Sequence, residues 1–391
     1  MSRTSPQVIK LFFLVGIVWA AVVGPGSVVL ILVHKGATNP QVGIVTALAA
    51  VLSMVFQPMW GMISDKTGSP RRVLCICLVG SAIFFGSVLF SSNLYLVAGL
   101  LLMDMVFRCG VVGLLDSHTL SELKILPGIE YGHIRLAGSI FFGSLSLIYS
   151  VIIGSRGVMA IIPISTVIAF TAILYGLFIA KGKGEGTVQR VKPNLKKDTV
   201  ALLLNKQYLV LILFSGLFAL AGHPLWVFLI EFVLDVGGHA GNVPLVHALR
   251  CVIEIPLFIA VSNYCKRVKA KKLMIISIGF MVVYALGMFL ANSLFWIIIA
   301  HLVGGTPGFV FGLTGRLRYL NEVTSEAMRS TSITLMGTME IGFGAIVGGL
   351  IGGFVLEAYG TQTLTLVSLV ALAIALGMLL LVRSKKSEEL A

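Results

Sequence analysis

Apolar runs recur along the whole of this 391-residue chain, and most are about 18 residues or longer, enough for a helix to cross a hydrocarbon core of roughly 30 Å. Hydrophobic residues make up 57% of the chain and charged residues only 12%. Soluble domains carry about a quarter charged residues, so too little polar surface remains here to cover a water-soluble body. The sequence therefore predicts an all-α membrane protein and excludes a soluble enzyme, a disordered chain and a nucleic-acid module.

Charged and turn residues divide the apolar sequence into twelve predicted transmembrane helices. These cover 11–33, 40–62, 72–91, 94–121, 132–153, 157–180, 207–234, 244–263, 273–291, 294–315, 330–356 and 361–383. One long polar stretch, from Lys181 to Lys206, follows the sixth helix. The sequence thus predicts a six-helix bundle over 1–180, a cytoplasmic linker over 181–206 and a second six-helix bundle over 207–391.

The positions of lysine and arginine predict the orientation, because cytoplasmic loops are enriched in both. With the N-terminus inside, the inner segments hold 24 of the 29 basic residues, and the outer loops hold only Lys35 and Arg156. The other three, Arg108, Arg135 and Arg250, lie within or at the edges of helices. We expect a multi-pass protein of the inner membrane with both termini in the cytoplasm. Its net charge of +13 then faces anionic membrane lipids, not nucleic acid.

The two halves of the chain resemble one another. The segment from Pro58 to Arg72 ends the second helix and begins the third, and the segment from Pro256 to Lys272 does the same in the second half. The two prolines are 198 residues apart, close to half the chain. Internal repeats of this kind are typical of secondary transporters, whose binding sites lie near the bilayer midplane between the repeats. Two pseudo-symmetric bundles are therefore expected.

The loop after the second helix carries a family motif. Gly61-x-x-x-Asp65-Lys66-x-Gly68-x-x-Arg71-Arg72 is similar to GxxxD(R/K)xGxRR, the loop motif of the major facilitator superfamily, with one extra residue before the arginine pair. The resemblance implies the major facilitator fold. It also implies that these six residues form a cytoplasmic gating latch, in which the glycine is closely packed and the acid and cations bridge helices.

A second resemblance extends over the whole chain. The segment from Glu130 to Ser139 resembles the signature of the lactose permease-like and phenylpropionate permease-like branch, with His133 in place of its first arginine. The branch implies that Arg135 pairs with Asp116 in the cavity; an ion pair at the cytoplasmic end is the alternative. It also implies that Glu254 of the eighth helix contacts substrate or a coupling proton and that the eleventh helix carries a glycine ladder. The tenth helix departs from the sugar permeases, because Gly304–Pro307 holds neither their histidine nor their acid.

Ionisable residues inside apolar runs are the candidates for the site, since each costs about 2.5 kcal/mol or more in hydrocarbon. Asp104 and Arg108 are four residues apart and share a helix face. A structural ion pair and a role in coupling explain them equally well. Arg250 and Glu254 repeat this spacing on the eighth helix, and again an internal salt bridge is the alternative.

Three further residues complete the candidate set. Glu340 lies among the glycines of the eleventh helix and is a candidate coupling acid. Trp226 either stacks on a ring-bearing substrate or lies at the interface, as tryptophan often does. Glu231 is expected in the outer headgroup region.

These observations predict a monomeric secondary transporter, not an enzyme. We expect it to move a small polar or anionic organic solute, such as a sugar, a nucleoside or an aromatic or organic acid, by alternating access and proton symport. The alternative within transport is a proton-driven exporter. The seven histidines show no metal-ligand spacing, so we predict no metal site and no cofactor beyond the proton gradient. A membrane enzyme would need a convergent nucleophile or metal site, and the sequence pattern shows neither. A scramblase would need a polar stripe facing lipid, whereas the polar positions here are expected to face inward.

Overall fold

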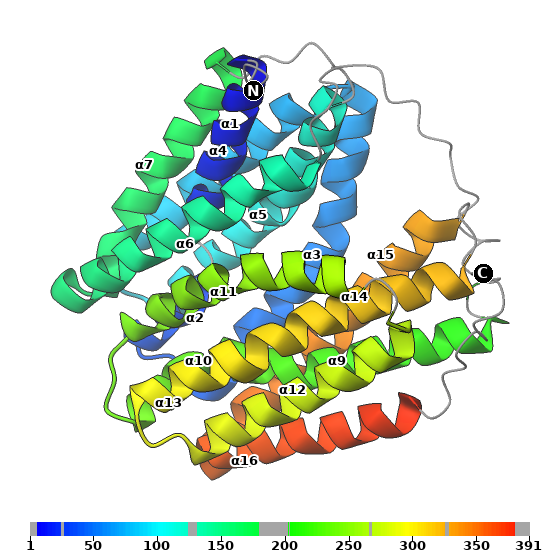
Figure 1. Cartoon of the computed structure of the whole chain (residues 1–391). Coiled ribbons are helices and arrows are strands. Elements are labelled where there is room, and N and C mark those ends of the chain that lie inside the picture. Colours follow the sequence, from blue (N-terminus) through cyan, green and yellow to red (C-terminus); the bar gives the residue numbers. More distant parts are fainter. Residues whose placement is uncertain are drawn as a thin grey trace. The chain divides into compact units, whose positions relative to one another are not determined.

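The computed structural model describes residues 6–24, 27–123, 131–179, 202, 204–265, 268–324 and 328–379, and all of the regular secondary structure in them is helical. The described helices fall into two compact units, considered separately below (Figure 1). The predicted linker and both chain ends lie largely outside the described residues, so the linker boundaries and the cytoplasmic termini stay predictions.

Unit 1 contains the described parts of Met1–Thr38, Leu48–Arg190 and His239–Cys251. Its helices are α1 (Pro6–Ala21), α2 (Val28–His34), most of α3 (Asn39–Thr67), α4 (Pro70–Ser87), α5 (Leu94–Leu123), α6 (Tyr131–Arg156), α7 (Ile161–Leu174) and the π-helical segment η4 (Tyr175–Ile179). Helix α4 packs along α5 and α7, and α1 packs along α6. Leu14, Leu74, Val111 and Leu115 form part of the apolar core between them.

Unit 2 contains the described parts of Asn39–Ala47, Val191–Gly238 and Val252–Ala391. Its helices are α9 (Lys206–Val227), α10 (Leu229–Asp235), most of α11 (Asn242–Tyr264), α12 (Ala270–Leu290), α13 (Leu294–Ile299), α14 (Thr306–Val323), α15 (Arg329–Glu340) and α16 (Gly348–Leu379). Two π-helical segments interrupt them, η5 (Ala300–Gly305) before α14 and η7 (Ile341–Val347) before α16. Helix α9 packs along α16, and α12 packs along α14.

Ten of the described helices are long and apolar enough to cross a membrane. The first predicted helix, over 11–33, is divided into α1 and α2, as the sequence Gly24-Pro25-Gly26 predicts, because glycine and proline interrupt helices. Gly24 lies between them, where a Cβ atom would come within 1.7 Å of the Ser165 hydroxyl oxygen. The last two predicted helices are continuous except at Gly360, whose φ of 77° and ψ of 179° are not helical. The expected number of twelve membrane crossings stays a prediction.

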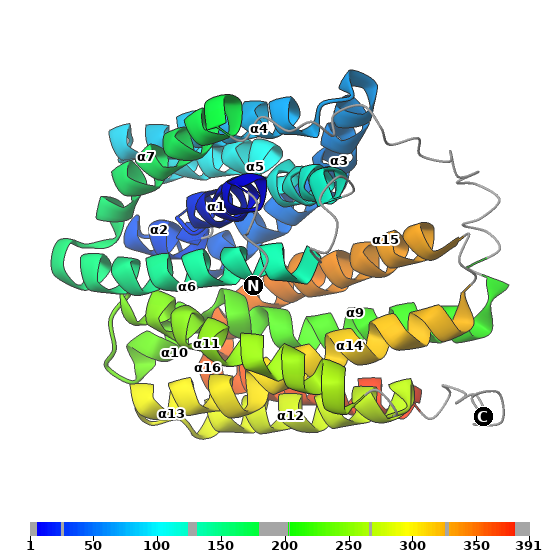
Figure 2. The ribbon, with the colours of Figure 1, turned by 45° about the horizontal axis from the view of Figure 1, so that its top comes forward.

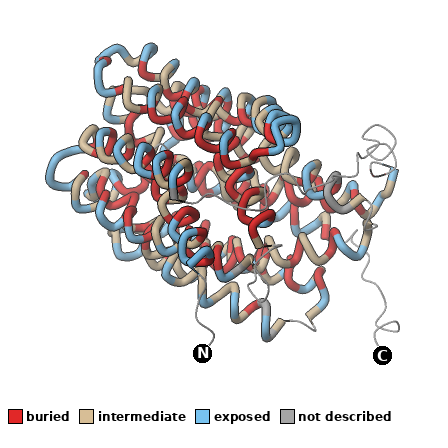
Figure 3. The backbone as a smooth tube through the Cα atoms, turned by 90° about the horizontal axis from the view of Figure 1, so that it is seen from above, coloured by how far each residue is buried: buried red, intermediate tan, exposed pale blue. Residues whose placement is uncertain are grey.

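Burial follows the helical repeat within the described elements. Figure 3 shows buried and exposed residues alternating along the tube, as they do when one face of each helix packs on its neighbours. Many exposed side chains are large and apolar, among them Ile83, Val151, Phe178, Val252 and Phe354. Such side chains suit a surface in contact with lipid, which agrees with the composition.

Candidate functional site

A fully buried carboxylate lies in the middle of unit 1. Asp104 of α5 has no exposed surface, and each of its oxygens accepts one hydrogen bond. The hydroxyl of Ser81 on α4 donates to Oδ1 at 2.5 Å, and Nε of Arg108 donates to Oδ2 at 2.9 Å. The pair forms because residues four apart meet on one face of a helix. The structure contains the ion pair that the four-residue spacing of Asp104 and Arg108 predicts.

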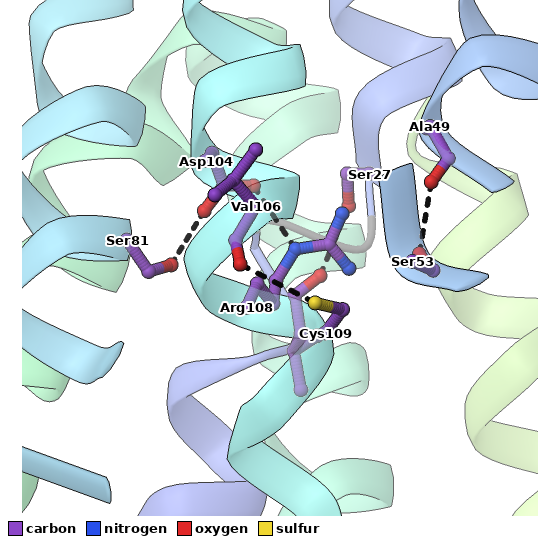
Figure 4. Close-up of polar contacts among 9 residues, drawn as sticks. Ser27, Ala49, Ser53, Ser81, Asp104, Val106, Arg108 and Cys109 are labelled. Atoms are coloured by element: carbon purple, nitrogen blue, oxygen red, sulfur yellow. Dashed lines mark hydrogen bonds and ion pairs between the residues drawn. The ribbon is translucent and has the colours of Figure 1, made fainter. Parts of the chain in front are cut away.

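Arg108 uses only one edge of its guanidinium for this pair. A guanidinium has five N–H donors, and the structure records no protein acceptor for the two terminal nitrogens among the described residues. The side chain retains 18% of its exposure. Figure 4 shows the guanidinium directed away from Ser81 and toward Ser27, on the side where Ser53 of α3 also lies. Arg108 therefore has N–H groups that the described residues leave unused, on the side toward Ser27 and Ser53, whose hydroxyls donate to backbone carbonyls.

Asp116 and Arg135 both interact with Tyr131 in unit 1. The hydroxyl of Tyr131 donates to Oδ1 of Asp116 at 2.7 Å, and the positive charge of Arg135 also acts on this carboxylate. The guanidinium carbon of Arg135 lies 3.9 Å from the ring centroid of Trp19, in a cation–π contact. The four side chains thus form one cluster, in which Tyr131 and Trp19 are additions that the charge pattern did not reveal.

Gly138 makes room for the contact between Arg135 and Trp19. A Cβ atom at this position would lie 2.6 Å from Cδ1 of Trp19 and 2.8 Å from Nη1 of Arg135. The indole N–H of Trp19 is buried and has no hydrogen-bond acceptor among the residues that the structure describes. Any larger residue at position 138 would therefore displace Trp19, Arg135 or both.

Unit 2 holds a second buried arginine, which pairs with Glu340. Nη1 of Arg316 on α14 donates to Oε1 of Glu340 at 2.6 Å, and Nε donates to the carbonyl of Gly312 at 3.1 Å. The guanidinium carbon also lies 4.9 Å from the ring centroid of Phe218 on α9. Arg316 is only 3% exposed. Glu340 is the last residue of α15, directly before the π-helical segment η7.

Sequence reasoning missed Arg316 because the predicted helix ended at residue 315 and left the arginine in a cytoplasmic loop. The helix continues to Val323. A signal for this was present, since Tyr319 and Leu320 follow Arg316 at helical spacing and both are buried. Arg316 belongs to the candidate site, and its placement in the loop was wrong.

Three further candidates lie on α9 and α11. Arg250 lies in the part of α11 that groups with unit 1, and Glu254 in the part that groups with unit 2; both are half-buried. Trp226, in the last turn of α9, is 36% exposed. The roles of these three residues stay predictions.

The loop motif begins in the last turns of α3 and continues into α4. Gly68, between the helices, has a φ of +62°, a backbone conformation that favours glycine. Arg71 is 7% exposed, and its Nη1 donates to the carbonyl of Gly176 in η4 at 3.1 Å. A Cβ atom at Gly61 would meet nothing within 4 Å among the described residues, so the expected close packing of that glycine is not seen there. A gating role for Asp65, Lys66, Arg71 and Arg72 stays a prediction.

Comparisons with known proteins agree with this arrangement. A family model described as "MFS_1 like family" matches residues 28–367. An uncharacterized transporter of Bacillus subtilis, YwbF, is 23% identical over 345 residues, which cover 86% of this chain and 84% of that one. The maltose permease of Geobacillus stearothermophilus is 25% identical over 339 residues, which cover 82% of this chain and 80% of that one.

Solved structures show the same fold. The nucleoside transporter NupG superposes with a TM-score of 0.78 at 18% identity, over 97% of this chain and 98% of that one. A bacterial homologue of the human lysosomal transporter Spinster gives a TM-score of 0.69 at 13% identity, over 97% of this chain and 98% of that one. The all-helical fold, its apolar spans and the family match lead to one conclusion: the chain belongs to the MFS_1-like family and is a membrane transporter of the major facilitator type, not an enzyme.

Proposed function

We propose that this transporter moves a small polar or anionic organic solute by alternating access, in symport with protons. In this proposal the chain is a monomer of the inner membrane, with twelve membrane crossings in two pseudo-symmetric bundles and both termini in the cytoplasm. The observation that carries the proposal is the half-used guanidinium of Arg108, which is bound to Asp104 on one edge and open on the other.

The open edge of Arg108 fits an oxygen-rich solute. An arginine within a membrane span costs about 2.5 kcal/mol or more, and such residues usually face a partner or a wet cavity. Charge-assisted hydrogen bonds from a guanidinium to a carboxylate or phosphate are about twice as strong as neutral ones, and they are often bidentate. Ser27 and Ser53 on the same side add hydroxyl groups that can bond to the hydroxyls of a solute.

Sharing of Arg108 between Asp104 and a solute supplies a route to proton coupling. Asp104 is fully buried, and Arg108 is its recorded cationic partner. A buried carboxylate that loses its cation is costly as an anion and is neutralised by taking up a proton. A solute anion that draws Arg108 away would therefore favour protonation of Asp104. Solute and proton would then bind together.

The pair in unit 2 supports the same chemistry. Arg316 and Glu340 connect α14 to α15 through one 2.6 Å hydrogen bond, and the carboxylate keeps 28% of its exposure. Among the described residues, each unit therefore contains an arginine–carboxylate pair in which one partner is almost fully buried and the other is partly exposed. The relatives named as a nucleoside transporter and a maltose permease support a hydroxyl-bearing solute for this chain.

A binding screen on the purified protein tests the proposal. Nucleosides, sugars and aromatic acids are added in turn, and a ligand that binds only the folded state raises the melting temperature. We expect one of these classes to give a shift that disappears in Arg108→Gln. The matched control is Arg156→Gln, because Arg156 is exposed at the end of α6. An undiminished shift in Arg108→Gln would rule out this arginine as the anchor.

Uptake into proteoliposomes separates symport from export. With the ligand found in the screen, a symporter accumulates solute when the outside is more acidic, whereas an exporter working as an antiporter accumulates it when the inside is more acidic. Equal accumulation with the gradient inward, outward or absent would contradict proton coupling.

A further inference from the structure

A buried histidine and tyrosine connect α12 to the π-helical segment η5. The Tyr284 hydroxyl lies 2.9 Å from Nε2 of His301, and the two ring centroids are 4.7 Å apart in an edge-to-face contact. His301 is 2% exposed and Tyr284 is 4% exposed. Neither residue belongs to the arginine–carboxylate pairs described above.

The second ring nitrogen of His301 determines which atom donates the hydrogen in the contact with Tyr284. Nδ1 of His301 lies 2.9 Å from the carbonyl oxygen of Ile297. A carbonyl can only accept, so Nδ1 carries a hydrogen and donates. In the neutral ring Nε2 is then an acceptor, and the Tyr284 hydroxyl donates to it. The histidine therefore joins its own helix backbone to the neighbouring helix.

These bonds lie where the backbone of the tenth apolar span changes its repeat. The helix is α-helical over α13, π-helical from Ala300 to Gly305, and α-helical again from Thr306. The hydroxyl of Thr306 donates to the carbonyl of His301 at 2.9 Å, so both ends of the π turn carry side-chain bonds to the backbone. Short π-helical turns inside α-helices are rare and often mark functional sites.

The glycines beside the turn allow close contact with α12. A Cβ atom at Gly304 would lie 2.5 Å from the backbone nitrogen of Tyr284, and one at Gly308 would lie 2.8 Å from Cγ of Met281. Figures 1 and 2 both show α12 alongside α14. The backbone of α12 comes close to the chain at Gly304, and the side chain of Met281 fills the space beside Gly308; small residues of this sort let membrane helices approach closely.

A cavity of about 460 Å³ adjoins the segment before the turn. Its lining includes Ile297, whose carbonyl accepts the histidine bond, together with Met288 and Asn292. The cavity thus touches α13 at Ile297, one turn before the contact made by His301.

We propose that His301 and Tyr284 form a latch that holds a hinge at η5 and so positions Arg316. This inference rests on the proposed transport function, and both residues are positioning residues that do not contact the solute. Arg316 lies 11 residues after Gly305 on α14, about three helical turns away. A change of angle at η5 therefore moves the guanidinium relative to Glu340, and release of the latch permits that movement.

Hydrogen–deuterium exchange tests the latch on the purified full-length protein without any transport. The measured region is 297–306, compared among the parent, Tyr284→Phe, His301→Leu and the double variant. We expect Tyr284→Phe to speed exchange there about tenfold, the effect of one ordinary hydrogen bond. His301→Leu should speed it at least as much, because it also removes the bond to the Ile297 carbonyl. The double variant should be no faster than His301→Leu, because partners in one contact are not additive.

Tyr149→Phe in unit 1 is the matched control. It removes another buried tyrosine hydroxyl, which lies 2.6 Å from the Ser165 hydroxyl, and it should leave exchange at 297–306 unchanged. Unchanged exchange in Tyr284→Phe, or fully additive effects in the double variant, would overturn the latch.

A transport measurement on the same variants separates the latch from the transport proposal. The latch predicts that kcat changes severalfold in Tyr284→Phe while KM stays within about twofold, because solute contacts are untouched. If exchange responds as expected but no solute is transported by the parent, the latch stands and the proposed function fails. If KM rises with kcat unchanged, the pair acts on binding and the latch is wrong.

Discussion

Arg316 and Glu340, 24 residues apart in sequence, are joined by a 2.6 Å hydrogen bond between α14 and α15. The arginine is almost completely buried, whereas the glutamate retains 28% of its exposure. The arginine therefore depends on the glutamate for its compensation, since removing one partner of a buried pair leaves an uncompensated charge.

Glu340→Ala should for this reason destabilise the protein by about 3 kcal/mol or more. Arg316→Met with Glu340→Ala should be better tolerated than Glu340→Ala alone, because no charge then stays buried. Thermal unfolding in detergent measures both. Equal loss in the single and double variants would show that the charge of Arg316 is not what Glu340 compensates.

Ser81→Ala removes one of the two hydrogen bonds to Asp104. The serine is itself buried, at 6% exposure, and no water is expected to replace its hydroxyl. We expect a loss of roughly 1–3 kcal/mol, the cost of a buried charged acceptor with a bond unmade. The double variant Ser81→Ala/Asp104→Asn should lose less than the sum of the two single changes. Additive losses would contradict a bond between the two side chains.

Gly138→Ala should lower transport by displacing Arg135 from Trp19. The added methyl group would lie within 3 Å of both side chains, so the cation–π contact has to break. Arg135→Ala should have a similar effect. The matched control is Gly99→Ala on α5, where a Cβ atom would meet nothing within 4 Å among the described residues. If both glycine variants transport equally well, the cluster around Arg135 has no part in the cycle.

The raised pKa of Glu231 should make the stability of the protein depend on pH. Glu231 lies in the short helix α10, after the span Lys206–Val227 and in the expected outer headgroup region, and its pKa is raised by burial and then by the negative charges of Asp235 and Glu357. A carboxyl group with a raised pKa in the folded state favours folding when protonated, so its cost is absent at low pH and grows as the pH rises through that pKa. Glu231→Gln should therefore melt at a higher temperature than the parent at pH 7.5, with the difference vanishing near pH 4. A difference that is largest in acid would reverse the sign and contradict the burial of this group.

The fold class could be predicted from the sequence because a helix that crosses the hydrocarbon core needs about 20 consecutive, mostly apolar residues. Helix ends were less predictable. The break after Ala21 falls beside the sequence Gly24-Pro25-Gly26 and has a local signal, because proline lacks the N–H that a helix interior needs. The end of α14 was misplaced because an arginine near a membrane boundary resembles a snorkelling side chain.

Local spacing predicted contacts within one helix but not between helices. Asp104 and Arg108 could be paired from their four-residue separation, since helix geometry alone brings them together. The pairing of Arg316 with Glu340, the contact of Tyr131 with Asp116 and the bond from Ser81 to Asp104 each join two helices. Sequence alone does not state which helices are neighbours.

Proton uptake on solute binding tests the central claim most directly. The purified protein is placed in a weakly buffered solution, and the pH is followed as the solute with the largest thermal shift is added. The account predicts that the parent takes up protons on binding, that Asp104→Asn binds the solute without proton uptake, and that Arg108→Gln does not bind it. Binding without proton uptake in the parent, or unchanged uptake in Asp104→Asn, would contradict the sharing of Arg108 between Asp104 and the solute.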